Sequence, residues 1–164
     1  MKMQMWERLL AAEHMSGMMS AADEADELAA AARDDSATRM QKLLDRGIGD
    51  RGAAGDAAGA GDAMAAAMAE AAERGHAEVV RVMLDAGVAV DGVVRSDGGW
   101  TALHVASDAG KEHVVGMLIR AGADVKARTA RGSTVLYVAC KEGHVGVVRL
   151  LIGAGAVVQG SLVF

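Results

Sequence analysis

The sequence contains no proline, one cysteine and very few aromatic residues. Without proline, the 21 glycines must provide most of the punctuation between structural elements. The aromatic residues are Trp6, Trp100, Tyr137 and Phe164, so the apolar mass consists of Ala, Val, Leu and Met. This composition suits small, closely packed helices and disfavours a β-sandwich, whose strands are rich in β-branched and aromatic residues.

Other absences exclude whole classes of protein. The single cysteine, Cys140, excludes an intramolecular disulfide and a multi-cysteine zinc site, and it favours a reducing compartment. No run of about 18 apolar residues exists to span a membrane. The net charge of −5 disfavours a general nucleic-acid binder, which needs an excess of Lys and Arg to neutralise phosphates.

The first residues carry no evident targeting signal. Met1–Arg8 lacks the apolar segment of a signal peptide, and the acids Glu7 and Glu13 are unlike a mitochondrial presequence. We therefore expect an intracellular protein, cytoplasmic in the first place, with the nucleus as the alternative.

The chain repeats itself with a period of 33 residues. When residues 96–128 are shifted onto residues 129–161, identities fall at spacings that make structural sense, which composition bias alone would not produce. The matched pairs include Thr101 with Thr134, Leu103 with Leu136, Ala106 with Ala139, Gly110 with Gly143, Leu118 with Leu151 and Gly122 with Gly155.

Each unit contains the signals of two short helices. Thr101 can cap the first helix, which places Leu103 and Ala106 on one face and ends at Gly110. The second helix ends at Gly122 and carries an apolar stripe of Val114, Val115, Leu118 and Ile119. A unit of helix, tight turn, helix and hairpin-like loop is too small to bury its apolar face alone, so it must stack on a neighbour.

These units resemble the ankyrin repeat. Thr101–Ala106 follows the family's T-P-L-H-x-A signature, and Thr134–Ala139 is a second copy at the family's period. Ala102 and Val135 replace the proline, and Tyr137 stands where histidine is usual. The resemblance implies an all-α ankyrin-repeat solenoid of stacked helix–turn–helix units with short β-hairpin-like loops.

Two degenerate units precede the clear ones. Gly75 and Gly87 each lie 35 residues before their counterparts, which indicates a two-residue insertion around Val93 and Val94. The first helix of this unit is expected at Ala65–Glu73. The expected organisation is an N-terminal segment able to form a capping helix (1–24), a degenerate first repeat (25–47), a flexible Gly/Ala-rich insert (48–62), a second repeat (63–95), a third (96–128) and a fourth, whole or truncated (129–164).

Residue types that often carry chemistry form no catalytic or metal-binding pattern. The histidines, none of which is paired at a metal-ligand spacing, are His14, His76, His104, His113 and His144. The resemblance implies that His76, His104 and His144 hydrogen-bond to loop backbone. Cys140 is expected to be a small buried helix residue, with no partner at a fixed offset to activate it. The glycine-rich residues 52–61 lack the G-K-[ST] of a phosphate loop. We expect no enzyme activity, catalytic residue, cofactor or metal.

The remaining function is binding by a surface. The resemblance implies that hairpin tips and the exposed edge of each first helix form a concave groove for a partner protein. The residues that it places there are Glu73, Arg74, Asp97, Trp100, Asp108, Arg131, Ser133, Lys141 and Glu142. Trp100 precedes the helix cap, where no core role is required, and is either a binding anchor or packed over a neighbouring hairpin. We expect a non-catalytic protein–protein interaction module whose partner is neither nucleic acid nor membrane.

A second hypothesis concerns the last unit. Its apolar helix is followed by Leu162, Val163 and Phe164, whereas terminal repeats normally present a polar outer face. The chain is then a segment of a longer repeat array, or it self-associates through this C-terminal unit.

Overall fold

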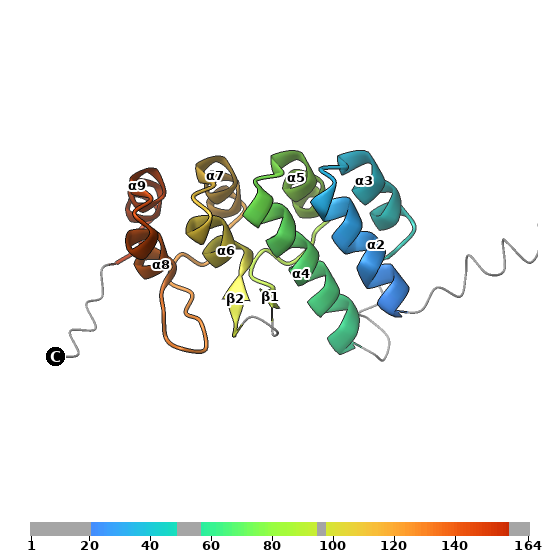
Figure 1. Ribbon diagram of the computed structural model, residues 1–164, viewed down its shortest axis with the longest axis horizontal. Helices are drawn as coiled ribbons and strands as arrows, with labels where there is room; N and C mark the ends of the chain where they lie inside the picture. The colour runs from blue at the N-terminus through green and yellow to red at the C-terminus, as the bar shows by residue number, and fades with distance from the viewer. Residues whose placement is uncertain (1–20, 49–56, 95–97, 158–164) are drawn as a thin grey trace, which may run out of the picture.

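Pairs of antiparallel helices stand side by side in a single row (Figure 1). The computed structural model describes residues 21–48, 57–94 and 98–157. The four pairs are α2 (Ala21–Arg33) with α3 (Ala37–Asp45), α4 (Ala57–Arg74) with α5 (Ala77–Asp85), α6 (Ala102–Asp108) with α7 (Glu112–Arg120), and α8 (Val135–Glu142) with α9 (Val145–Gly153). This architecture confirms the predicted solenoid of helix–turn–helix units.

Polar side chains start three of the helices, because the first N–H groups of a helix need acceptors from outside it. The hydroxyl of Thr101 accepts from the backbone N–H of His104, and Thr134 does the same for Tyr137 at 3.1 Å. Ser36 caps α3 through the N–H of Arg39. The predicted cap at Thr101 is therefore confirmed, and Thr134 makes the same cap in the fourth repeat.

One continuous apolar core runs through the stack. The first helices of successive repeats pack on one another in the order α2, α4, α6 and α8, and the second helices pack in the order α3, α5, α7 and α9. The core includes the predicted stripe residues Val114, Val115 and Leu118 of α7, each almost fully buried. Every repeat thus closes part of its neighbour's apolar surface.

A small antiparallel hairpin lies between the second and third repeats. Strand β1 (Val93–Val94) pairs with β2 (Trp100–Thr101), with Val94 opposite Trp100 and Val93 opposite Thr101. The residues predicted as an insertion therefore form a strand. Between the third and fourth repeats, the loop contains only the bridge between Arg128 and Thr134. Both loops project from the same side of the helix row (Figure 1).

Imidazole groups link successive repeats at their inner turns. His144 Nε2 donates to the carbonyl of Asp108 at 2.8 Å, and His76 Nε2 lies 3.2 Å from the carbonyl of Arg33. Lys111 occupies the equivalent position between the second and third repeats, where its aliphatic carbons lie beside Gly75. The expected histidine contacts with loop backbone between units are therefore present.

Helix α4 begins earlier than predicted. Helix α4 starts at Ala57 instead of Ala65, so residues 57–62 are helical where a flexible insert was expected. The alanine content supports a helix here despite the glycines, because alanine has the highest helix propensity. Helix α2 starts at Ala21, inside the segment 1–24. The predicted capping helix over residues 1–20 and the insert residues 49–56 lie outside the described residues.

Candidate functional site

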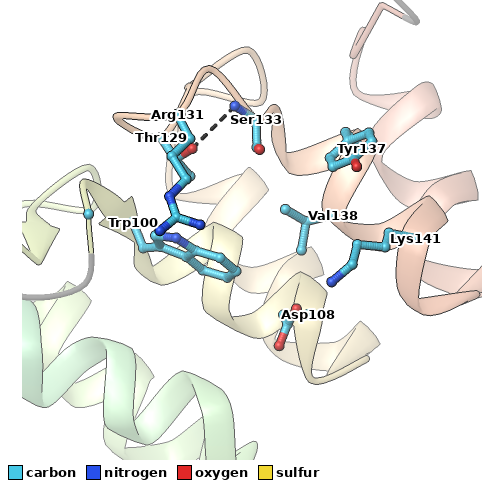
Figure 2. A pocket seen from close by; sticks show the side chains of 9 residues that line it. Trp100, Asp108, Thr129, Arg131, Ser133, Tyr137, Val138 and Lys141 are labelled. Carbon is cyan, nitrogen blue, oxygen red and sulfur yellow. Dashed lines mark hydrogen bonds between the residues drawn. The ribbon is translucent and has the colours of Figure 1, made fainter.

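A hollow of about 590 Å³ lies between the third and fourth repeats. Its lining comes from both hairpin loops and from the facing ends of α6 and α8 (Figure 2). The lining residues are Gly98, Trp100, Asp108, Thr129, Arg131, Ser133, Tyr137, Val138 and Lys141. The hollow therefore combines an aromatic and aliphatic floor with charged groups at its edges.

Trp100 forms one wall of the hollow. Its backbone is fixed by pairing with Val94 in the hairpin, and its side chain is half-buried. The indole lies against the imidazole of His104, with ring centroids 5.9 Å apart and planes inclined by 53°. Trp100 thus packs against a residue of its own repeat and also lines the hollow, and its role as a binding anchor stays a prediction.

His104 supports Trp100 from behind. The imidazole Nδ1 of His104 accepts from the backbone N–H of Thr101 at 3.3 Å. The backbone N–H of His104 donates to the Thr101 hydroxyl, so the two residues form a capping box. The side chain is fully buried, and this burial lowers the pKa of His104, against an opposing effect of the backbone of Ser133 and Ala127. No hydrogen bond of normal geometry reaches Nε2 within the described part of the chain. The lowered pKa and the accepting role of Nδ1 both favour the neutral imidazole.

The turn that carries Arg131 is held by several backbone hydrogen bonds. Thr129 N–H donates to the Ser133 carbonyl at 2.9 Å, and Gly132 N–H donates to the Thr129 carbonyl at 2.8 Å. Ser133 N–H also donates to the Thr129 hydroxyl at 3.2 Å (Figure 2). These bonds fix the position from which Arg131 extends.

The two hairpin loops are also tied to each other. Ala130 N–H donates to the Gly98 carbonyl at 2.8 Å. Gly99 has a φ of +80°, and a Cβ at this position would lie 3.2 Å from the Ala130 nitrogen. Glycine therefore provides both the left-handed backbone and the close approach that bring the loops together.

The opposite edge of the hollow is charged. Asp108 ends α6, and Lys141 lies at the corresponding position near the end of α8, with their side chains directed toward each other in Figure 2. Lys141 Nζ lies 2.9 Å from Glu142 Oε1. Hydrogen bonding to Glu142 raises the pKa of Lys141, and the charges of Glu142 and Asp108 act in the same direction.

The structure gathers some of the predicted site residues and separates others. Trp100, Asp108, Arg131, Ser133 and Lys141 all line the hollow. Glu142 stands beside it as the ion-pair partner of Lys141.

The remaining predicted positions lie elsewhere. Glu73 and Arg74 are exposed at the end of α4, where Arg74 pairs with Glu70 at 2.8 Å, and neither residue lines the hollow. Asp97 lies outside the described residues.

Besides the glycine at position 98, three lining residues are not in the predicted set: Thr129, Tyr137 and Val138. Tyr137 carried a signal, because it replaces the family's usual histidine. Its equivalent in the third repeat, His104, is fully buried, whereas the Tyr137 side chain is 59% exposed. A tyrosine at this position adds an aromatic ring and a hydroxyl to the rim of the hollow.

The prediction that Cys140 is buried is wrong. The sequence position indicated a small buried residue, but Cys140 is exposed. Its equivalent in the third repeat, Ser107, is fully buried. Ser107 lies on α6, which α8 covers, while within the described residues no further helix packs on the outer side of α8.

Residues 21–48, 57–94 and 98–157 contain no group of three or more His, Cys, Asp or Glu side chains arranged to hold a metal ion. None of the helices in these ranges has both the length and the apolar character needed to cross a membrane.

Comparison with known families identifies the repeats. The family described as ankyrin repeats (3 copies) matches residues 28–129, and a single ankyrin repeat matches residues 131–159. The chain belongs to the ankyrin repeat family. Ankyrin repeats are generally protein–protein interaction modules and are typically non-catalytic. A search of curated proteins found no match to the chain.

Within the ankyrin framework, the hollow lies where two adjacent hairpins meet the ends of two first helices. The family matches begin within α2 and extend through all the later helices. The described geometry and the family assignment therefore agree on the elements that bound the hollow.

Proposed function

We propose that this ankyrin repeat protein is a non-catalytic module that binds another protein through the hollow between its third and fourth repeats. The observation that carries the proposal is the position of Trp100, which stands half-buried in a wall made of two loops that are hydrogen-bonded to each other. Interface residues that contribute most to affinity are enriched in Trp, Tyr and Arg and lie in preformed pockets. Trp100, Tyr137 and Arg131 supply all three residue types.

The test begins with partners captured from the source cell and then measures the affinity of variants for them. Trp100→Ala is expected to weaken binding by about 2 kcal/mol, roughly thirtyfold, while the helical content stays unchanged. Val93→Ala is a matched control, because Val93 is an exposed apolar residue of β1 that does not line the hollow. Equal affinity of the Trp100→Ala variant and the unmodified chain for every captured partner would refute this site.

A second function is favoured by the outer face of the fourth repeat. Ile152 is 53% exposed, whereas the equivalent side chain in the third repeat, Ile119, is half-buried under the next repeat. Leu150 is exposed on the same helix. We propose that this face joins a second copy of the chain or a further repeat of a longer array.

Sedimentation velocity tests the self-association. Ile152→Lys should convert any dimer of the chain to monomer, because it places a charge in an apolar contact. Val93→Lys is the matched control, since Val93 is 43% exposed on β1, away from this face. A chain that remains monomeric over a wide concentration range rules out self-association.

The proposed cellular location is intracellular. The free and exposed thiol of Cys140 suits a reducing compartment, where such a residue stays reduced.

A further inference from the structure

Arg131 is a cation at the rim of the hollow. The residue is exposed at the tip of its turn, and its side chain extends toward the indole of Trp100 in Figure 2. Within the described residues it makes no hydrogen bond or ion pair. Its guanidinium therefore offers five N–H donors to a group from outside.

The other cation of the hollow is already compensated. Lys141 is paired with Glu142 at 2.9 Å and also lies in the field of Asp108. An anionic group that enters the hollow would therefore meet Arg131 as its open partner. A planar guanidinium binds a carboxylate with two parallel hydrogen bonds, which a lysine cannot do.

The surroundings of Arg131 also favour a partner that carries an apolar side chain next to its acidic one. The aromatic face of Trp100 and the side chain of Val138 lie between Arg131 and the Asp108–Lys141 edge (Figure 2). An apolar side chain placed on this floor would be removed from water next to the carboxylate. Partial removal of water from an ion pair strengthens it relative to one on an open surface.

We propose that the hollow binds an extended protein segment in which an Asp or Glu side chain pairs with Arg131 and an adjacent apolar side chain lies over Trp100 and Val138. The inference rests on the proposed function and specifies the chemistry of the partner. The hydrogen-bonded turn at residues 129–133 and the bond between Ala130 and Gly98 hold both recognition elements in place before binding. The net charge of −5 gives no long-range attraction for an acidic partner, so the recognition is local to Arg131.

The experiment selects peptides from a random dodecapeptide phage library on three forms of the full chain. These are the unmodified protein, Arg131→Gln and the control Arg149→Gln. Arg149 is exposed on α9 and does not line the hollow, so both variants lose one positive charge from the surface. We expect the unmodified chain and Arg149→Gln to enrich an Asp or Glu next to a large apolar residue, and Arg131→Gln to lose the acidic preference.

A selected peptide is then synthesised and its affinity measured by fluorescence anisotropy. Arg131→Gln should weaken binding about tenfold, and Arg149→Gln should leave it unchanged. Trp100→Ala should also weaken binding, which places the peptide in the hollow.

The outcomes separate the two proposals. If the unmodified chain selects no peptide, this inference fails, while the hollow's function is decided separately by the affinity of Trp100→Ala for captured partners. If it selects peptides without an acidic preference, or if the preference survives in Arg131→Gln, the hollow still binds peptides, but the proposed pairing of an acidic side chain with Arg131 is wrong. If a phosphoserine in place of the selected acid binds more than tenfold tighter, the partner is a phosphorylated segment and the inference is overturned.

Discussion

Leu118 illustrates how one side chain stabilises two repeats. It is fully buried in the core, on the helix that packs against both α5 and α9. Leu118→Ala should lower the free energy of unfolding by about 2–5 kcal/mol, because it removes buried methyl groups and leaves a cavity. Urea denaturation followed by circular dichroism measures the change.

The control for this prediction is Ile152→Ala in the next repeat. The Ile152 side chain is 53% exposed, so its removal should cost within about 0.5 kcal/mol. Similar losses for the two variants would show that the packing of the repeats differs from the one described.

His104 makes stability depend on pH. Burial lowers the pKa of His104 in the folded chain below its ordinary value of 6.5, so below pH 6.5 the unfolded chain binds a proton that the folded chain does not. The contribution of His104 to the free energy of unfolding is fully present above pH 6.5. It is lost as the pH falls toward the lowered pKa of the folded chain. Thermal melts of the protein at pH 7.5 and pH 5.5 should therefore show a lower melting temperature in acid.

His104→Gln isolates this effect. Glutamine keeps an acceptor at the capping-box position but has no proton to gain in this pH range. The variant should lose less stability between pH 7.5 and pH 5.5 than the unmodified chain. An identical loss would assign the acid sensitivity to other groups.

At the scale of the element, the glycines that end the first helices have different surroundings in different repeats. Gly110 and Gly143 occupy equivalent positions with φ of +68° and +76°. A Cβ on Gly110 would lie 2.6 Å from His144 Nδ1, whereas a Cβ on Gly143 would meet nothing within 4 Å. The two positions therefore separate backbone strain from contact between repeats.

Alanine substitutions at these two sites give a direct prediction. Gly143→Ala should cost about 1 kcal/mol for the left-handed backbone alone. Gly110→Ala should cost more, because it also displaces His144 and breaks its hydrogen bond to the Asp108 carbonyl. Urea midpoints compare the variants, and equal losses would mean that His144 contributes nothing to the contact between repeats.

At the scale of the whole molecule, inner and outer repeats should differ in local stability. The second and third repeats pack on a neighbour at both sides, while among the described helices the fourth packs on one side only. Amide hydrogen exchange should therefore be slowest in α4–α7 and faster in α9, since opening a terminal repeat breaks one interface. Uniform protection across all repeats would contradict this prediction.

The sequence predicted the parts of the molecule that follow from local rules. The cap at Thr101 and the left-handed glycines at 110 and 122 were predictable, because hydroxyl caps and positive φ depend on residues close in sequence. The start of α4 at Ala57 was not, because glycines among the alanines resemble a linker, and the local pattern does not show that these alanines belong to the helix that packs on α2.

The candidate site was predictable only in part for a related reason. Trp100 and Arg131 could be predicted, because their positions relative to the repeat motif place them at the hairpin tips. The exposure of Tyr137 and Cys140 depends on whether another repeat follows, and position within a repeat carries no information about that. The hollow itself requires the two loops to meet, which depends on the hydrogen bond between Ala130 and Gly98.

The longer β1–β2 hairpin makes the boundary between the second and third repeats different from the one that follows. A partner segment that lies along several repeats would contact a different surface at each repeat boundary. Moving the segment by one repeat would therefore remove its complementary contacts. A partner should therefore bind in a single register and with one-to-one stoichiometry, even though the scaffold beneath it is periodic.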